Sequence, residues 1–431
     1  MMKEPQPTST EKERVLLVMI DYKDNGHWDM QDHINEMTEL VKTSGGEVVD
    51  HVTCHLSKPS ARYFIGEGKL EDVQKAVEYH QVQTVIFSHD LKGSHQRNLE
   101  EVIQAKTIDR TQLILDIFAK HATSKEGKMQ VELAQLEYLL PRLVGKGVEL
   151  SRLGGGIGTL GPGETKLEVD RRVIGDKITR LKRGLEEVTA QRQLKRKRRK
   201  DNGVPTLSLV GYTNAGKSTL LNALTDAKQV TKDGMFTTLD SLSRQLDLPN
   251  HQHVIVSDTV GFMHDLPHHL IESFKATLEE VNASDVLIHV IDVTHPHFRN
   301  LHQSVMDVLA QLKAHEKPMI TVFNKIDRLT DRSWLGNLAS NYPNGVCLSA
   351  KTKEGVDQLN EKMEELLSAL YIEINEDIPI NRMDLVNLAH EKGEVISIKY
   401  YNDKINIRAH LPAHLAGKFP LKKKIHDEES F

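Results

Sequence analysis

A glycine-rich segment near the middle of the chain combines residue types that can bind phosphate groups. The sequence GYTNAGKS occupies positions 211–218, directly after an apolar run at Leu207–Val210 and before a helical pattern at Thr219–Leu224. Glycines let successive backbone N–H groups curl around phosphates, the lysine can neutralise the β- and γ-phosphates, and the serine hydroxyl can ligate Mg²⁺. This strand–loop–helix pattern predicts a nucleotide site. The residues expected to bind the nucleotide here are Gly211, Tyr212, Thr213, Asn214, Ala215, Gly216, Lys217, Ser218 and Thr219.

Two shorter motifs add groups for the terminal phosphate and its metal ion. The strand-like run His253–Ser257 ends in Asp258, which can hold the Mg²⁺ shell, and the backbone N–H of Gly261 can meet the γ-phosphate. Between these motifs, Thr238 can join the metal ion before hydrolysis and leave afterwards, and we favour it over Thr237. The expected Mg²⁺ ligands are Ser218, Thr238 and Asp258, and the expected catalytic residues are Lys217, Thr238 and Gly261.

A third pair of motifs indicates which base is bound. The run Met319–Phe323 leads into NKID at positions 324–327, and the carboxylate of Asp327 can accept hydrogen bonds from both N1–H and the 2-amino group of guanine. Adenine lacks that amino group and has an acceptor at N1, so the site should select GTP over ATP. After a further strand end, the N–H of Ala350 is expected to meet guanine O6. The residues expected around the base are Asn324, Lys325, Asp327, Ser349, Ala350 and Lys351.

One position departs from the pattern of many GTPases. Phe262 follows Gly261, where a glutamine commonly orients the attacking water. A phenylalanine side chain has no hydrogen-bonding group, so this residue cannot perform that task. The water must then be positioned by the backbone, by a cation or by a partner, and we expect the isolated protein to hydrolyse GTP slowly.

Length and composition limit the class of protein that carries these motifs. At 431 residues the chain should form about three folding units. Its two cysteines, Cys54 and Cys347, form no disulfide pattern, and the polar segment Met1–Arg14 lacks the apolar core of a signal peptide. The longest apolar runs are far too short to span a bilayer. We therefore expect a cytoplasmic protein with no membrane insertion.

The periodicity of apolar residues predicts the elements that position the motifs. Alternating strand and helix signals in residues 1–120 indicate a small parallel α/β domain, and the same alternation returns in the GTPase domain, residues 203–372. Between them, residues 121–202 carry two helical stripes joined by a glycine-rich loop, which predicts an antiparallel helical hairpin. Residues 373–420 predict a small α+β domain, followed by a charged tail at 421–431.

Positive charge is concentrated on the predicted hairpin, although the whole chain has a net charge of −5. Between Arg142 and Lys200 there are 17 Lys and Arg against 7 Asp and Glu, a balance of +10. A basic hairpin with a glycine-rich tip suits contact with RNA phosphates. It lacks interleaved aromatic residues, so sequence-specific binding of single strands is not expected.

Long motifs outside the nucleotide site resemble one family in particular. The segments Glu126–Leu143, Gly154–Arg172 and Asp258–Glu280 resemble the HflX family of ribosome-associated GTPases, as do Phe64–Val73 and Asp384–Val395. These are P-loop GTPases of the translation-factor-related class with a hydrophobic residue at the usual glutamine position. The resemblance covers almost the whole chain. It implies a GTPase that binds the large ribosomal subunit and its RNA and that splits or rescues stalled ribosomes.

The resemblance also implies roles for individual residues. It assigns phosphate, Mg²⁺ and guanine contacts to Lys217, Ser218, Thr238, Asp258, Asn324 and Asp327. In related GTPases with an asparagine at the position of Asn214, a potassium ion lies beside the phosphates, so K⁺ is a further candidate cofactor. A monomer is expected.

Two other functions are compatible with the same residues. The chain could be a GTPase that acts in ribosome assembly or on other RNA, or a binding switch with negligible turnover that recruits a protein. Two groups of histidines, around His51 and His55 and around His264 and His268, lack four ligands at zinc spacing and are interpreted as surface residues.

Overall fold

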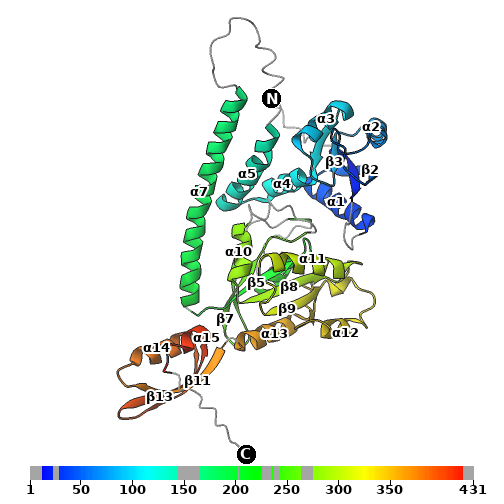
Figure 1. Ribbon diagram of the computed structural model, residues 1–431. Coiled ribbons are helices and arrows are strands. Elements are labelled where there is room, and N and C mark those ends of the chain that lie inside the picture. Colours follow the sequence, from blue (N-terminus) through cyan, green and yellow to red (C-terminus); the bar gives the residue numbers. More distant parts are fainter. Residues whose placement is uncertain are drawn as a thin grey trace, which may run out of the picture.

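The computed structural model describes residues 12–22, 29–143, 166–201, 203–225, 234–236, 242–263, 275–369 and 371–420. Its strands form three sheets of four, six and three strands, with helices packed against them (Figure 1). The α/β class expected from the sequence is confirmed. Within the described ranges, no helix is both long enough and apolar enough to cross a membrane.

The first sheet is wholly parallel, in the order β2-β1-β3-β4. Its elements are β1 (Arg14–Tyr22), α1 (Met30–Ser44), β2 (Glu47–Leu56), α2 (Glu67–His80), β3 (Thr84–Phe87), α3 (Gly93–Ile103), β4 (Lys106–Asp109) and α4 (Arg110–His121). Successive side chains of a strand point to opposite faces. Leu17 and Met19 therefore pack in the same cluster as α1 and α4, whereas Leu16 and Val18 pack with α2 and α3. Burial on both faces explains the unbroken apolar run of β1.

Two helices follow this sheet and lie side by side (Figure 1). They are α5 (Lys125–Leu139), which ends in the short 3₁₀ turn η1 (Leu140–Leu143), and α7 (Lys166–Asp201). The side chain of Ser124 caps α5 by accepting a hydrogen bond from the Gly127 N–H at 2.8 Å. Ion pairs join the two helices, including Arg192 to Glu126 at 2.7 Å. The helical pairing expected from the two stripes is thus present.

The second sheet carries the motif residues. Its elements are β5 (Thr206–Gly211), α8 (Lys217–Thr225), β6 (Leu242–Asp247), β7 (His253–Asp258), α10 (Lys275–Ala283), β8 (Val286–Asp292), α11 (Phe298–Gln311), β9 (Met319–Asn324), η3 (Ile326–Arg328), α12 (Leu335–Ser340), β10 (Val346–Cys347) and α13 (Val356–Ser368). The strand order is β10-β9-β8-β5-β7-β6, and only β6 runs antiparallel to its neighbour. Parallel strands place their carboxyl ends at one edge of the sheet, where ligands of open α/β sheets bind.

The last described unit is a small antiparallel sheet with helices packed on it. It consists of β11 (Tyr371–Pro379), α14 (Met383–Lys392), β12 (Glu394–Tyr400), β13 (Lys404–Pro412) and α15 (Ala413–Ala416). The strand order is β11-β13-β12, and the hairpin between β12 and β13 turns at residues 401–403. Alternate residues of β13, such as Ile405 and Ile407, are fully buried, which agrees with an α+β unit that has its own core.

One hydrophobic cluster joins the first sheet to the second. Helix α4 contributes Phe118, whose ring packs edge-on against that of Phe236 with centroids 4.8 Å apart. The backbone N–H of Met235 donates to the hydroxyl of Thr43 in α1 at 3.0 Å. The segment that precedes Thr237 in the chain is therefore held by the N-terminal unit.

Candidate nucleotide-binding site

The phosphate-binding loop begins where β5 ends, and two of its glycines have conformations that other residues rarely adopt. Gly211 has φ of +151°, and a Cβ there would lie 2.3 Å from the carbonyl oxygen of Val290. Gly216 has φ of +96°, and its Cβ would lie 2.3 Å from Nδ2 of Asn324. Glycine is therefore required at both positions. The loop leads into the first residue of α8. The free backbone N–H groups at this helix N-terminus favour an anion bound in the loop.

Lys217 is buried inside this loop. Its ammonium group donates to the carbonyl oxygens of Gly211 at 3.1 Å and Tyr212 at 2.9 Å. Burial lowers the pKa of Lys217 to about 8. The charge of Asp258 opposes this shift by raising the pKa, whereas the charge of Lys325 lowers it further. A lysine that has already lost its water shell gains strongly from a phosphate anion, because the phosphate returns the charge compensation that burial removed. This geometry fits the phosphate role predicted for Lys217.

The two described candidates for Mg²⁺ ligation meet where β7 ends at Asp258 and α8 begins with Lys217 and Ser218. The Ser218 hydroxyl donates to Oδ2 of Asp258 at 2.5 Å, and Asp258 is 1% exposed. A hydroxyl and a carboxylate are hard oxygen donors of the kind that Mg²⁺ prefers, and Mg²⁺ sites use few protein ligands beside substrate phosphates. The residues present therefore fit the metal ion. Bound there, Mg²⁺ would neutralise charge on the β- and γ-phosphates.

The segment after Asp258 is joined to the phosphate-binding loop by backbone hydrogen bonds. The Phe262 N–H donates to Gly211 at 3.0 Å, and the Thr213 N–H donates to the carbonyl of Phe262 at 2.8 Å. Between these bonds a Cβ on Gly261 would lie 2.8 Å from Cα of Thr213 and 2.9 Å from Nζ of Lys217. Gly261 thus lies beside the ammonium group of Lys217, which fits its predicted contact with the γ-phosphate. Phe262 is buried in the hydrophobic cluster that contains α4.

The groups predicted to bind the base lie together at the ends of β9 and β10. The amide of Asn324 donates to the Ala215 carbonyl at 2.8 Å and accepts from the Ala350 N–H at 2.9 Å. The hydroxyl of Ser349 donates to one carboxylate oxygen of Asp327 at 2.7 Å, which fixes the orientation of that carboxylate. In this structure the Ala350 N–H is used within the protein, so its contact with guanine O6 stays a prediction.

Lys325 contacts the phosphate-binding loop, and its partner Asp292 was not predicted from the sequence. Its ammonium group donates to the carbonyl of Asn214 at 2.7 Å and forms an ion pair with Asp292 at 2.7 Å. Asp292 is the last residue of β8, so the strand-end rule that identified Asp258 could also have found it. Asn214 has φ of +61°, a left-handed conformation that asparagine tolerates better than most residues. Lys351 is exposed on the neighbouring loop.

Two other expectations have different outcomes. Thr238 lies outside the described residues, and so do His264 and His268. Of the remaining histidines, His55 forms an ion pair with Asp21 at 2.7 Å. Within the part of the chain that the structure describes, no group of three or more His, Cys, Asp or Glu side chains is placed to hold a metal ion.

Comparisons with known proteins agree with this geometry. The chain matches the models for the GTP-binding GTPase N-terminal region over residues 31–119, the GTP-binding GTPase middle region over 121–199, and the 50S ribosome-binding GTPase over 206–325. A curated GTPase HflX from Caldanaerobacter subterraneus is 46% identical, covering 94% of this chain and 92% of its own length. The chain belongs to the HflX family of GTPases. An Escherichia coli HflX is 44% identical over 79% of this chain and 80% of its own length.

HflX membership makes GTP hydrolysis the activity of the site described above, and it confirms the family resemblance found in the sequence. Among solved structures, a GTP-binding protein from Sulfolobus solfataricus in complex with GDP is 24% identical. That match has a TM-score of 0.43 and covers 83% of this chain and 99% of the other.

Proposed function

We propose that this HflX GTPase binds the large ribosomal subunit through RNA contacts of helix α7 and uses its GTP cycle to dissociate or rescue stalled ribosomes in the cytoplasm. The family model matched over residues 206–325 describes a 50S ribosome-binding GTPase, which supports the choice of partner. The motif groups supply the chemistry. Lys217 and Gly261 would contact the γ-phosphate, and Ser218 and Asp258, together with Thr238, would hold Mg²⁺.

The charge distribution on α7 is the observation that carries the RNA part of this proposal. Arg171, Arg180, Arg183 and Lys197 have exposed side chains on this helix and form no ion pair among the described residues. These exposed cations, distributed around the helix between residues 171 and 197, can neutralise several phosphates. Other cations of α7 are already used within the protein, because Lys182 pairs with Glu137 at 2.8 Å.

Arg196, in the basic run at the end of α7, has a partner within the protein. Arg196 forms ion pairs with Glu280 at 2.9 Å and Glu279 at 3.3 Å in α10, and its side chain is 18% exposed. This residue attaches α7 to the GTPase sheet. We therefore place the RNA contacts on the exposed arginines nearer the start of the helix.

A packed route connects the nucleotide site to α7. Phe236, beside the segment that contains Thr238, packs on Phe118 of α4, and α4 shares its hydrophobic cluster with Val131 and Ala134 of α5. Helix α5 in turn contacts α7, where Met129 lies against Gly184. A nucleotide-dependent movement of Phe236 would thus reach the RNA-binding helix through side chains in contact.

Co-sedimentation of the full chain with purified ribosomes and a nonhydrolysable GTP analogue tests the partner. Binding should weaken steeply with salt, and replacement of Arg171, Arg180 and Arg183 by glutamine should lower the log–log salt slope by about three, one for each lost phosphate contact. The matched control replaces Lys177 and Lys182, whose partners are Glu132 and Glu137, and it should change the slope little.

Light scattering of intact ribosomes then tests dissociation. The protein with GTP should lower the scattered intensity as subunits separate, and the triple arginine variant should do so only at low salt. A triple variant with the salt slope of the unaltered protein would refute the α7 contact. Binding without any loss of scattering would instead refute dissociation and leave the RNA contact standing.

A further inference from the structure

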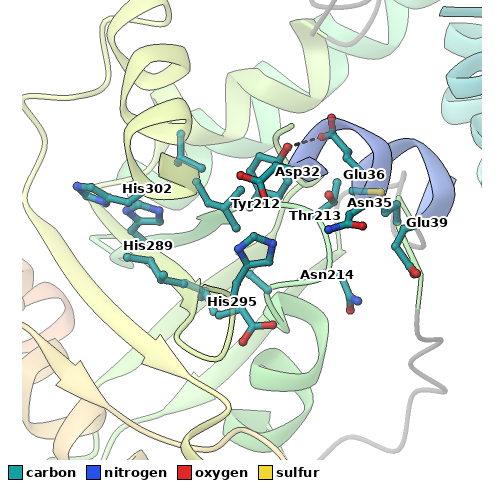
Figure 2. A pocket seen from close by; sticks show the side chains of 17 residues that line it. Asp32, Asn35, Glu36, Glu39, Tyr212, Thr213, Asn214, His289, His295 and His302 are labelled. Carbon is teal, nitrogen blue, oxygen red and sulfur yellow. Dashed lines mark hydrogen bonds between the residues drawn. The ribbon is translucent and has the colours of Figure 1, made fainter. Parts of the chain in front are cut away.

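A cavity of about 150 Å³ lies between helix α1 and the phosphate-binding loop (Figure 2). Its walls come from α1, from Tyr212 to Ala215, and from β8 and α11, with Met235 beside them. The cavity shares Tyr212, Thr213, Asn214 and Ala215 with the phosphate-binding loop. The side chains of Lys217, Asp258 and Asp327, which are assigned to the phosphates, the metal ion and the base, do not line it.

Most of the cavity wall is apolar. Val290 and Ile291 of β8 and Leu301 and Val305 of α11 line it. One end is formed by a buried histidine, His289, whose ring stacks on that of His302 with centroids 5.0 Å apart and planes 17° from parallel. Burial lowers the pKa of His289 to about 3, so this ring is neutral at physiological pH. A space of this size and lining can hold a body as large as one aromatic ring.

One wall of the cavity carries carboxylates, and their partners differ. Glu36 accepts hydrogen bonds from the hydroxyl of Tyr212 and, at 3.2 Å, from Arg110. Figure 2 shows the bond to Tyr212 as a dashed line. Glu39 pairs with Lys42 at 2.8 Å near the surface. Both carboxylates therefore already have partners among the side chains of the protein.

Asp32 is the exception. Its side chain is 8% exposed, its Oδ2 has no hydrogen-bond partner among the described residues, and its Oδ1 lies 3.6 Å from Nε2 of His297. A buried carboxylate oxygen without a partner costs free energy that a bound donor would recover. The lining thus combines a space for an apolar body with one unsatisfied anion.

We infer that this cavity is a binding site for a compact organic ammonium ion, with an apolar body in contact with Leu301 and Val305 and its cationic group on Asp32. A bare metal ion does not suit the site, because the walls are largely apolar and the described residues form no metal-ligand group. An occupant would contact α1 and the phosphate-binding loop together. It would therefore stabilise the packing of the N-terminal unit against the GTPase sheet.

Benzylamine is a suitable probe, and ligand-observed saturation-transfer NMR on the full chain is the measurement. We expect saturable binding with a dissociation constant of about 1 mM. Benzyl alcohol, which has the same ring and no charge, should bind about tenfold more weakly because the charge-assisted hydrogen bond is lost, and benzoate should not bind. Equal binding of benzoate and benzylamine would overturn the assignment.

Three comparisons place the probe in the cavity. Asp32→Asn should weaken benzylamine binding about tenfold, whereas Glu39→Gln, on the same wall but already paired with Lys42, should leave it unchanged. Val305→Phe should fill the apolar end and abolish binding, with thermal melts showing that each variant is folded. Excess GDP should not displace the probe, because Asp32, Leu301 and Val305, which would hold the probe, are not among the residues assigned to the nucleotide. Displacement by GDP, or an Asp32→Asn protein that binds as well as the unaltered one, would refute the site.

Discussion

The N-terminal sheet and the GTPase sheet each have a strand that ends in a buried aspartate, and the two aspartates have different surroundings. Asp109 is the last residue of β4 in the N-terminal sheet, and Asp258 is the last residue of β7 in the GTPase sheet. Each is 1% exposed. Position in the fold and burial are therefore the same for both, and only their neighbours differ.

Asp109 is surrounded by donors from its own fold. It accepts hydrogen bonds from the backbone N–H of Leu91 at 3.0 Å and of Gln112 at 2.9 Å, from the hydroxyl of Tyr138 at 2.8 Å, and from Arg142 at 3.0 Å. Burial raises the pKa of this carboxyl group, while these hydrogen bonds lower it. The contacts attach α5 and η1 to the first sheet, so this aspartate organises structure.

Asp258 lies beside groups that a ligand can recruit. The Ser218 hydroxyl is 2.5 Å away, and the buried ammonium of Lys217 attracts the carboxylate, in a loop whose glycines leave space for phosphates. A strand-end aspartate therefore becomes structural or chemical according to whether protein donors surround it. The comparison teaches that burial alone does not identify an active-site carboxylate.

The largest expected effect comes from replacing the chemical aspartate. Asp258→Asn should lower kcat/KM for GTP about a hundredfold or more, because the metal ion loses its charged protein ligand. Thermal unfolding should change little, since the asparagine keeps the shape and the hydrogen bond to Ser218. Steady-state hydrolysis and a thermal melt measure the two quantities. A large drop in melting temperature with turnover retained would reverse the roles assigned to the two aspartates.

The opposite pattern is expected for Asp109→Asn. Breaking a buried pair by removing one charge should lower the free energy of unfolding by about 3 kcal/mol, because Arg142 loses its counterion. GTP binding by the remaining folded protein should be nearly unaffected. Denaturant unfolding followed by a nucleotide titration checks both parts, with Asp116→Asn, on nearby α4, as a control. Unchanged stability would show that the network around Tyr138 does not hold α5 in place.

A pH titration would sharpen the description of the chemical site. With its pKa lowered to about 8, Lys217 loses its proton in the free protein as the pH rises through that value. Phosphate binding favours the charged form, so GDP affinity should be constant below about pH 7 and fall about tenfold per unit above 8. Calorimetry in two buffers should detect proton uptake near pH 8. Guanosine, which has no phosphate, should show no such dependence, and the same pH profile for both ligands would exclude Lys217 as its cause.

The local part of the proposed site could be inferred from the sequence for a physical reason. A glycine conformation, a strand-end carboxylate or a lysine in a phosphate loop depends on neighbours within a few residues, so spacing alone indicates Gly216, Lys217 and Asp258. Apolar runs indicate strands in the first sheet in the same way, but the edge strand β4, Lys106–Asp109, has no clear signal of this kind. The domain boundaries stay proposals.

Contacts between distant segments were not predictable in this manner. Nothing in the periodicity near Phe118 indicates that its ring packs on Phe236, more than a hundred positions later. Helix α5 shows the same limit. In the expected stripe Leu133 is buried but Met129 and Leu136 are only half-buried, whereas Val131 and Ala134, outside the stripe, pack in the cluster that contains α4. A helix buried on two sides has no single apolar stripe to find.

The smallest expected effect concerns the cation that replaces a catalytic glutamine. Asn214 is exposed on the phosphate-binding loop. Its backbone carbonyl accepts a hydrogen bond from Lys325 at 2.7 Å, and its side chain forms no hydrogen bond within the described part of the chain. Its amide oxygen is thus available to a potassium ion beside the phosphates, where positive charge would stabilise the transition state. Turnover with saturating large ribosomal subunits should be a few-fold faster in potassium than in sodium.

Asn214→Ala should remove this difference while leaving GTP affinity nearly intact, because the backbone contact with Lys325 does not depend on the side chain. Asn35→Ala, a neighbouring amide on α1, is the matched control and should keep the potassium response. Hydrolysis rates in the two salts at equal ionic strength provide the measurement. Equal rates for the unaltered protein would exclude the cation. Phe262 is buried and cannot orient water. Without the cation, the attacking water would have to be positioned by backbone groups near Gly261 and by the ribosome.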